Sequence, residues 1–219
     1  DRVDVILVAV PPYLASPVSV ECLRSGKHVM TEKPMGNTGE DARALYEASL
    51  VAKGHHMVAE NFFFQPGHIT LRRLAREGSW PFGEPLMLEL RQYWRMTPKT
   101  IAKYYHSPWR HDERLTWGYL IEGGCHTANP IREAFGMPRG IYSRMLSGDK
   151  RLGRFDTLIA NAVFEGGTAG QITMCYGFAS QTRHLFEVFS EGGTLRVESK
   201  RIIAAEDDGD ETEIPCENP

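Results

Sequence analysis

The sequence has no apolar run that approaches the roughly 18 residues needed for a helix to span a membrane. It opens with Asp1-Arg2-Val3-Asp4 and shows no signal peptide. It also lacks a basic excess, because 25 Lys and Arg stand against 28 Asp and Glu, which leaves a net charge of -3. We therefore expect neither a membrane nor a nucleic acid as a partner.

Cysteine is scarce and scattered. The four residues Cys22, Cys125, Cys175 and Cys216 form no CxxC pair. This usage predicts reduced thiols in a cytoplasmic protein, with neither a disulfide framework nor a metal site. The chain has no internal repeat and no low-complexity tract. Its 219 residues, 42% hydrophobic and 24% charged, are typical of one large or two small globular domains.

Residues 1–61 alternate between strand and helix patterns. The apolar run from Val5 to Val10 predicts a parallel strand buried on both faces. The order strand, helix, strand, helix, strand predicts parallel strands with right-handed crossovers. The expected strands are 3–10, 28–31 and 55–60, and the expected helices start at Ser16-Pro17 and at a Thr38–Asp41 capping box.

No GxGxxG turn precedes Val3, although a dinucleotide-binding domain carries one upstream of strands like these. The first strand has the character of a central strand, and a bare apolar edge is an aggregation hazard. We therefore expect the chain to be the later part of a longer protein. An intact small domain, paired through that edge to a partner chain, is the alternative.

The predicted parallel strands end in polar or proline-rich turns. These ends are Pro11-Pro12-Tyr13, Glu32-Lys33-Pro34 and Glu60-Asn61. Ligands of open parallel sheets bind outside the carboxyl ends of the strands, which share one edge. Pro34 disfavours a helical Lys33. An isolated Glu-Lys-Pro turn is usually a solvated loop, but its place at this edge predicts Lys33 in a cleft.

Residues 62–219 have a different pattern, which predicts a mostly antiparallel sheet with helices on one face. Glu165-Gly166-Gly167 and Glu191-Gly192-Gly193 are typical of hairpin turns. Residues 95–118 look irregular, and the acidic tail 206–219 shows no final packed element. The expected helices are 68–77 and 119–136, and the expected strands are 86–94, 141–146, 157–164, 168–177, 184–190 and 194–197.

Glu122-Gly123-Gly124-Cys125-His126 is a second informative stretch. On a helix, Glu122 and His126 lie on one face, and a carboxylate near an imidazole orients it and raises its basicity. Taken alone, such a pair is usually an ordinary surface pair. Its spacing does not match the two histidines of an HExxH zinc site.

Taken together, these segments resemble the glucose-fructose oxidoreductase/inositol dehydrogenase family (Gfo/Idh/MocA), and the resemblance covers nearly the whole chain. Val5 to Pro11 resembles the family's fourth strand, and Gly26-Lys27-His28-Val29 through Glu32-Lys33-Pro34 resembles its "GKHV..EKP" signature. Glu60-Asn61 through Pro66 resembles the crossing into its second domain. Ser107-Pro108-Trp109-Arg110 and Gly118 through His126 together resemble its "WR…GG.LLDGG.H" segment.

The resemblance implies an oxidoreductase that uses NAD or NADP and acts on a sugar, polyol or related carbonyl compound. It implies part of a Rossmann-type domain over residues 1–61. An open-faced substrate and oligomerisation domain over 62–219 would form a homo-oligomer through its sheet. The implied roles are catalysis by Lys33, His126 and Glu122, cofactor binding by Pro11, Pro12, Glu32, Lys33 and Pro34, and substrate contact by Asn61, Trp109 and Arg110.

Two departures from the family pattern leave alternatives open. Glu122 stands where the family usually has Asp, and Pro130 has no N–H for the carbonyl of His126, so we expect a helix that starts late or kinks. These departures favour a second hypothesis, a non-catalytic NAD(P)- or sugar-binding sensor of the same fold. A third is that the chain alone is inert because its cofactor site is incomplete.

Overall fold

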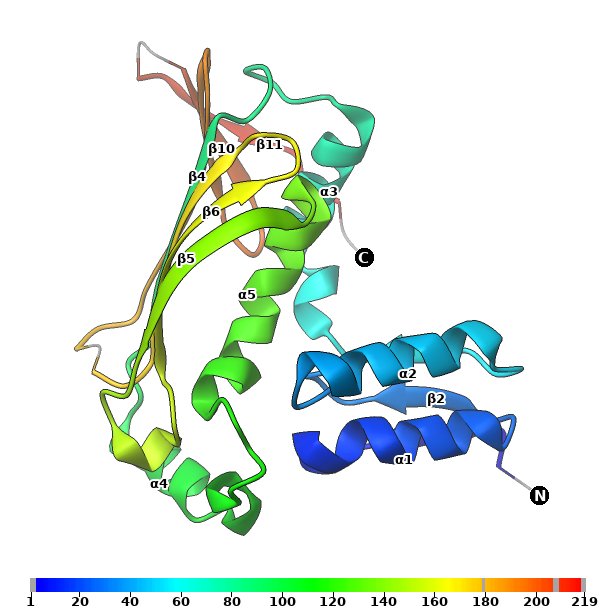
Figure 1. Cartoon of the computed structure of the whole chain (residues 1–219). Coiled ribbons are helices and arrows are strands. Elements are labelled where there is room, and N and C mark those ends of the chain that lie inside the picture. The colour runs from blue at the N-terminus through cyan, green and yellow to red at the C-terminus, as the bar shows by residue number, and fades with distance from the viewer. Residues whose placement is uncertain (1–2, 179, 207–208, 218–219) are drawn as a thin grey trace.

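The computed structural model of the protein describes residues 3–178, 180–206 and 209–217, which form two sheets and the helices around them. Figure 1 shows the small sheet with its two helices on one side of the long helix α5 (Tyr119–Phe135) and the large curved sheet on the other. The observed fold class is the expected one. The division between residues 61 and 62 stays a prediction.

The small sheet is parallel, in the order β1 (Val5–Val8), β2 (His28–Thr31) and β3 (His56–Val58). Helices α1 (Pro12–Arg24) and α2 (Gly39–Val51) connect the strands and pack against each other. The core of this unit consists of Val8, Leu23, Val29 and Leu45. The predicted strand, helix, strand, helix, strand order is therefore confirmed.

The expectation that the first strand is central and buried on both faces is wrong for the described chain. β1 lies at an edge, and Val5 and Leu7 are 62% and 64% exposed, whereas Val8 is buried. Two successive right-handed crossovers between adjacent strands place both helices on one face of the sheet. Alternate side chains on the other face therefore stay uncovered by the described residues.

Helix α1 begins four residues before the Ser16-Pro17 pair that was expected to start it. Pro12 occupies its first turn, and the carbonyl oxygen of Pro11 accepts from the N–H groups of Leu14 and Ala15. Proline suits a first turn because its missing N–H has no helical partner there. Ser16 lies inside the helix, and its hydroxyl donates to the carbonyl oxygen of Asp41 at 2.6 Å, which ties α1 to α2.

The capping box of α2 is present as expected. The N–H of Asp41 donates to the Thr38 hydroxyl, and the N–H of Thr38 donates to the Asp41 carboxylate, each at 3.1 Å. The box satisfies two backbone donors that have no helical partner.

Removal of this cap gives a stability prediction that needs no substrate. Thr38→Ala loses the side-chain acceptor, and we expect the free energy of unfolding to fall by about 1 kcal/mol. Thr38→Ser keeps the hydroxyl and serves as the matched control. Urea denaturation of both variants checks this, and equal stabilities for Ala and Ser would show that the cap contributes nothing.

The large sheet has the strand order β11-β10-β9-β8-β4-β7-β6-β5. All neighbours pair antiparallel except β4 and β7, which are parallel, and the expected hairpins connect β6 to β7 and β8 to β9. Its strands are β4 (Met87–Tyr93), β5 (Pro138–Leu146), β6 (Thr157–Phe164), β7 (Ala169–Cys175), β8 (Arg183–Ser190), β9 (Gly193–Val197), β10 (Ile202–Glu206) and β11 (Glu211–Ile214).

One face of the large sheet carries the main core. Alternate residues of its central strands, such as Leu88 and Phe186, are fully buried beneath the helices. Helices α3 (Pro66–Glu77) and α5 pack on each other over this core, and a short 3-10 helix, η1 (Asn61–Phe64), leads from β3 into α3. This arrangement brings the end of β3 next to the middle of α5.

Two expectations for the second half are wrong. Residues 95–118 contain α4 (Pro98–Tyr105), because the Thr97 hydroxyl caps a helix with Pro98 in its first turn. The acidic tail contains β11, which pairs with β10, a strand that the sequence did not suggest. Acidic side chains are typical of an edge strand. Residues 207–208 and 218–219 of that tail lie outside the described residues.

Candidate active site

Lys33 and His126 line one cavity of about 370 Å³ between the small sheet and α5. Glu60 and Asn61, at the end of β3, line the same cavity, together with Glu32. Four of these residues follow the carboxyl ends of parallel strands, where the sequence placed a cleft, and His126 comes from the second half of the chain. The two parts of the chain thus meet at this cavity.

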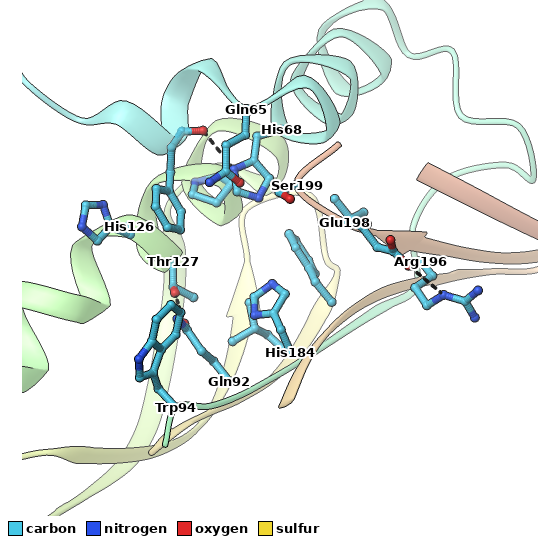
Figure 2. A pocket seen from close by; sticks show the side chains of 15 residues that line it. Gln65, His68, Gln92, Trp94, His126, Thr127, His184, Arg196, Glu198 and Ser199 are labelled. Atoms are coloured by element: carbon cyan, nitrogen blue, oxygen red, sulfur yellow. Dashed lines mark hydrogen bonds and ion pairs between the residues drawn. The ribbon is translucent and has the colours of Figure 1, made fainter. Parts of the chain in front are cut away.

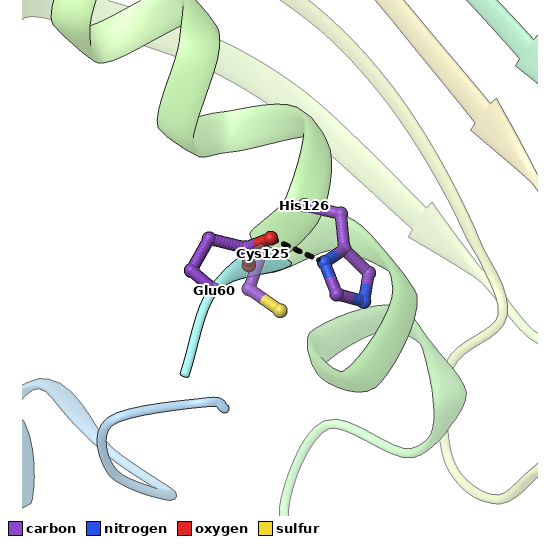
Figure 3. Close-up of side chains that lie close together, drawn as sticks. All are labelled: Glu60, Cys125 and His126. Carbon is purple, nitrogen blue, oxygen red and sulfur yellow. Dashed lines mark hydrogen bonds and ion pairs between the residues drawn. The ribbon is translucent and has the colours of Figure 1, made fainter. Parts of the chain in front are cut away.

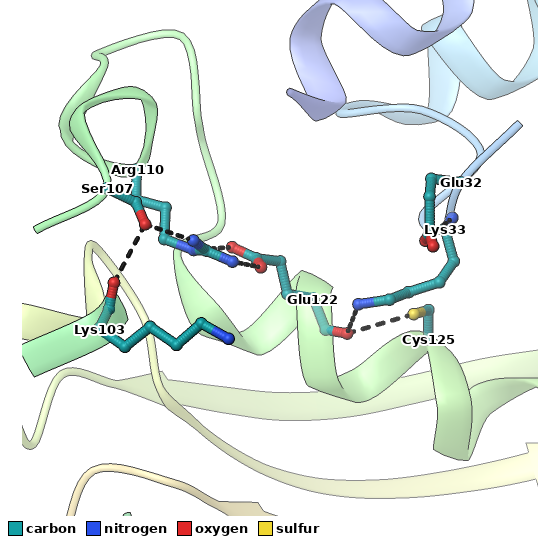
Figure 4. Close-up of polar contacts among 7 residues, drawn as sticks. All are labelled: Glu32, Lys33, Lys103, Ser107, Arg110, Glu122 and Cys125. Carbon is teal, nitrogen blue, oxygen red and sulfur yellow. Dashed lines mark hydrogen bonds and ion pairs between the residues drawn. The ribbon is translucent and has the colours of Figure 1, made fainter. Parts of the chain in front are cut away.

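Lys33 reaches across from the small sheet to α5. Its Nζ donates to the carbonyl oxygen of Glu122 at 3.1 Å, and its own backbone N–H donates to the Glu32 carboxylate at 2.9 Å (Figure 4). Pro34 is buried and follows Lys33 through a cis peptide bond. These contacts hold the ammonium group at the cavity rather than in bulk solvent.

His126 is held by Glu60, not by Glu122. Its Nδ1 lies 2.7 Å from Oε1 of Glu60, and both side chains are largely buried, at 16% and 12% exposure (Figure 3). The backbone N–H of Phe62 donates to the same Oε1 at 2.9 Å, and the Phe62 ring stacks on the imidazole with centroids 4.4 Å apart. One carboxylate and one ring therefore fix the plane of the imidazole.

The pKa of Glu60 lies below its ordinary value of 4.5. Burial by itself raises this pKa, but the hydrogen bonds from His126 and from the Phe62 N–H, with the nearby charges of His126 and Lys33, outweigh it. Glu60 is thus ionised near neutral pH and can only accept. The proton between Glu60 and His126 consequently resides on Nδ1, which leaves Nε2 with the lone pair in the neutral ring.

This shift predicts how stability changes with pH. A carboxylate whose pKa is lowered on folding stabilises the folded state above its unfolded value, and the contribution is lost as the pH falls through the folded pKa. We expect the difference in free energy of unfolding between wild type and Glu60→Gln to be largest above pH 4.5 and to shrink in acid. Urea denaturation across pH measures this, with the exposed Glu47→Gln as control. A difference that grows as the pH falls would contradict the shift.

The expected role of the Glu122 carboxylate in orienting His126 has no support in the geometry. Oε1 and Oε2 of Glu122 accept from Nε and Nη2 of Arg110 at 3.2 and 2.9 Å (Figure 4). The Arg110 guanidinium also stacks over the rings of Trp109 and Tyr104, at 4.2 and 4.4 Å from their centroids. The longer Glu side chain therefore reaches a cation in the 3-10 helix η2 (Pro108–His111) rather than the imidazole.

A second cavity, of about 240 Å³, adjoins the first, and Glu32 and Lys33 line both. Five more predicted site residues gather here, namely Pro11, Pro12, Trp109, Arg110 and Glu122, whereas Pro34 lines neither cavity. Pro11 and Pro12 come from the end of β1, so this cavity lies at the carboxyl edge of the parallel sheet. Apart from Pro34, the predicted cofactor and substrate residues thus divide between two neighbouring cavities that share Lys33.

Helix α5 runs from Tyr119 through Pro130 to Phe135, so the late start considered for it is not seen. Gly123 has a packing role, because a Cβ there would lie 2.7 Å from the ring of Tyr176. The glycine lets α5 approach the end of β7 closely, which sets the position of His126 three residues later.

Cys125 lies beside the Glu60–His126 pair. Possible ligand atoms of Glu60, Cys125 and His126 all lie within 4.8 Å of one another (Figure 3). Burial raises the pKa of the Cys125 thiol to about 12, and the thiol donates to the carbonyl of Glu122 at 3.4 Å. Because thiolate is the form that binds metals, this arrangement favours a hydrogen-bonded cluster over a metal site.

Sequence reasoning missed Glu60 and Phe62 as site residues. The available signal was position, since both follow β3 at the edge where Lys33 lies. Asn61 lies between them and lines the cavity as expected.

Comparisons with known proteins agree with this architecture. A family model described as "Oxidoreductase family, NAD-binding Rossmann fold" matches residues 1–62, and one described as "GFO/IDH/MocA C-terminal domain" matches residues 68–196. The chain belongs to the Gfo/Idh/MocA family. Its resemblance to this family, first inferred from the Glu-Lys-Pro and His126 segments, is thereby confirmed.

Among curated Gfo/Idh/MocA relatives, the chain is 27% identical over 150 residues to scyllo-inositol 2-dehydrogenase (NADP(+)) IolW of Bacillus subtilis, which covers 66% of the chain and 38% of that protein. It is 31% identical over 77 residues to levoglucosan dehydrogenase of Pseudarthrobacter phenanthrenivorans, covering 35% of the chain and 20% of that protein. The chain thus spans well under two thirds of the length of these relatives and is homologous to NAD(P)-dependent dehydrogenases.

Solved structures show the same fold. An oxidoreductase from Thermotoga maritima matches with a TM-score of 0.85 at 27% identity, covering 98% of this chain and 64% of that one. A levoglucosan dehydrogenase in complex with NADH and levoglucosan matches with a TM-score of 0.80 at 19% identity, covering 96% and 60%. Within the described residues, no helix is both long and apolar enough to span a bilayer.

Proposed function

We propose that the protein is an NAD(P)-dependent oxidoreductase that transfers a hydride between nicotinamide and a sugar, polyol or related carbonyl compound. The observation that carries this proposal is the shared cavity, in which Lys33 from the small sheet and His126 from α5 both present polar groups. The named activities of the curated relatives, on inositols and levoglucosan, support the substrate class.

The proton chemistry follows from the hydrogen bonds. A carbinol carbon gives up hydride only as its hydroxyl proton is removed, so a base must lie within hydrogen-bond reach. We assign this role to Nε2 of His126, because Glu60 holds the proton on Nδ1. The Lys33 ammonium stabilises the alkoxide oxygen as it forms. When bound, NAD or NADP supplies the hydride chemistry.

The residues present suit the nicotinamide end of such a cofactor. The cavity at the carboxyl edge of the parallel sheet is lined by the Pro11-Pro12 turn, Glu32 and Lys33, and this edge is where dinucleotides bind in sheets of this kind. We assign cofactor contact to these residues and to the adjacent Pro34. They provide apolar walls for a planar ring and one cation for an oxygen substituent.

Substrate contact is proposed for Asn61, Trp109 and Arg110. Asn61 has the more direct position, because it lines the cavity that contains Lys33 and His126. Arg110 is already bound to Glu122 and to the Ser107 hydroxyl, so we propose that it acts mainly by keeping Trp109 in place. Glu122 then acts by holding Arg110 and by offering its carbonyl oxygen to Lys33.

The alternative is a non-catalytic sensor, and it is favoured by the Glu122 carboxylate, which binds Arg110 and not His126. One experiment separates the two. The protein is incubated with NAD or NADP and a panel of inositols and neutral sugars, and reduced cofactor is followed by absorbance. Cofactor reduction with at least one compound is the expected result. Cofactor binding without reduction across the panel would support the sensor, and absence of binding would support an inert chain.

We further propose that the protein forms a homo-oligomer through the uncovered face of the large sheet and works in the cytoplasm. That face exposes apolar or aromatic side chains of β4, β5 and β6, including Met87, Tyr142, Ile159 and Val163. The four cysteines are free thiols, as a reducing compartment would keep them. Sedimentation equilibrium tests the assembly, with Ile159→Lys expected to shift the protein toward monomer. A wild type that is monomeric at high concentration would overturn this part.

A further inference from the structure

A third cavity, of about 410 Å³, lies beyond His126, between the helices and the large sheet (Figure 2). Its volume is in the range typical of small-ligand sites, about 300 to 1,000 Å³. Strands β4, β8 and β9 line it, with Trp94 just past β4. The elements η1, α3 and α5 and the β9–β10 turn supply the other lining residues. No role proposed above uses this cavity, apart from His126 at its border.

The cavity wall is rich in polar groups that carry no net charge. Burial lowers the pKa of both His68 and His184, and the nearby His184 lowers the pKa of His68 further. The two imidazoles are therefore neutral near pH 7. Two charged residues of the lining, Arg196 and Glu198, form an ion pair at 3.6 Å, so their charges offset one another.

The contacts of several of these groups determine which of their atoms donate and which accept. The Phe62 carbonyl accepts from Nδ1 of His68 at 3.0 Å, so Nε2 of His68 is an acceptor. The Thr127 hydroxyl donates to Oε1 of Gln92, which leaves the Gln92 NH2 group to donate. Gln92 and His68 are only 5% and 7% exposed. Both residues line the cavity, so they offer it one donor and one acceptor that a polar ligand can bind in place of water.

Trp94 adds a flat apolar surface to these donors and acceptors, and it is 45% exposed. An aromatic face beside neutral donors and acceptors suits the alternating C–H and O–H faces of a sugar ring. A carboxylate or phosphate group would find no unpaired cation among the described lining residues. The chemistry therefore selects an uncharged, polyhydroxylated ligand.

The position of the cavity relates it to the reaction site. Phe62 lines it and stacks on His126, which borders both this cavity and the one that contains Lys33. A substrate whose reacting carbinol lies between Lys33 and His126 thus has room for a further unit on the other side of the Phe62–His126 stack. We propose that the substrate is an uncharged glycoside larger than a monosaccharide, whose non-reacting unit binds in this cavity. This inference rests on the proposed function.

The test compares a disaccharide with its constituent monosaccharide. Turnover of maltose, cellobiose and glucose is measured in wild type, Trp94→Ala and His184→Ala. We expect each variant to raise the ratio of the disaccharide KM to the glucose KM about 10-fold, through lost stacking or a lost hydrogen bond. Trp117→Ala, a partly exposed tryptophan outside the cavity, is the matched control and leaves the ratio unchanged. An unchanged ratio in both cavity variants overturns the proposal.

A binding measurement separates this proposal from the proposed function. Isothermal titration calorimetry of maltose and cellobiose reports occupancy without turnover. Binding that Trp94→Ala weakens about 10-fold, in a protein that reduces no cofactor, supports the cavity and removes the enzymatic proposal. Turnover of glucose or inositol with no disaccharide binding removes the cavity proposal and leaves the enzymatic one.

Discussion

Lys33→Ala is expected to lower the turnover number by about 10²- to 10⁴-fold, the range of a group that assists proton transfer and alkoxide stabilisation. The Lys33 ammonium lies at the cavity that contains His126, anchored 3.1 Å from the Glu122 carbonyl oxygen. Its loss removes the cation that faces the developing negative charge. Initial rates of cofactor reduction measure the effect with a compound that the substrate panel identifies.

Two further variants make the Lys33 result specific. Lys53→Ala removes an exposed lysine from the same half of the chain and should retain full turnover. Lys33→Arg keeps the charge but has a larger, planar head group, so we expect a smaller loss than with alanine. Circular dichroism should show the same fold in all three. Full activity in a folded Lys33→Ala variant would remove Lys33 from the catalytic assignment.

His126→Ala is expected to produce a loss of similar size, because it removes the proposed base. Added imidazole should restore part of the rate, since a free base can enter the space that the side chain leaves. The Glu60 carboxylate would then have no ring to hold, so Glu60→Gln in the His126→Ala background should change the rate little further. The measurements are the turnover number with and without imidazole and the double-mutant comparison.

The control for this prediction is His106→Ala, which removes an exposed histidine after α4. His126→Asn keeps a polar side chain of moderate size and tests whether loss of packing against Phe62, rather than loss of the base, explains the effect. If the alanine variant folds and imidazole gives no rescue, while His126→Asn turns over at the wild-type rate, the imidazole is not the base.

The sequence predicted the edge at which the site forms, because strand direction alone decides it. Parallel strands that end at residues 8, 31 and 58 bring Pro11, Lys33 and Glu60 to one edge whatever packs elsewhere. The Thr38 cap and the glycine hairpins were predictable for the same reason, since their chemistry is local. The start of α1 was mistaken although the signal is equally local, because both Pro12 and Pro17 suit a first turn.

The partner of His126 could not be predicted from spacing. Glu122 lies four residues before His126 on α5, but Arg110 in η2 competes for its carboxylate, and the contact depends on how η2 folds back on α5. Glu60 reaches the imidazole only because η1 turns the chain from β3 toward α5. Both contacts depend on the tertiary fold. The third cavity likewise depends on the tertiary fold, since its lining comes from six separate elements, η1, α3, β4, α5, β8 and β9.

The central claim is that Lys33 and His126 act on one atom of a substrate beside nicotinamide. The most direct test is a crystal structure of the protein with NADH and an unreactive substrate analogue. The account predicts that the reacting oxygen lies within about 3.2 Å of both Nζ of Lys33 and Nε2 of His126. An analogue bound elsewhere, or an oxygen that meets neither group while solvent fills the cavity between them, would contradict it.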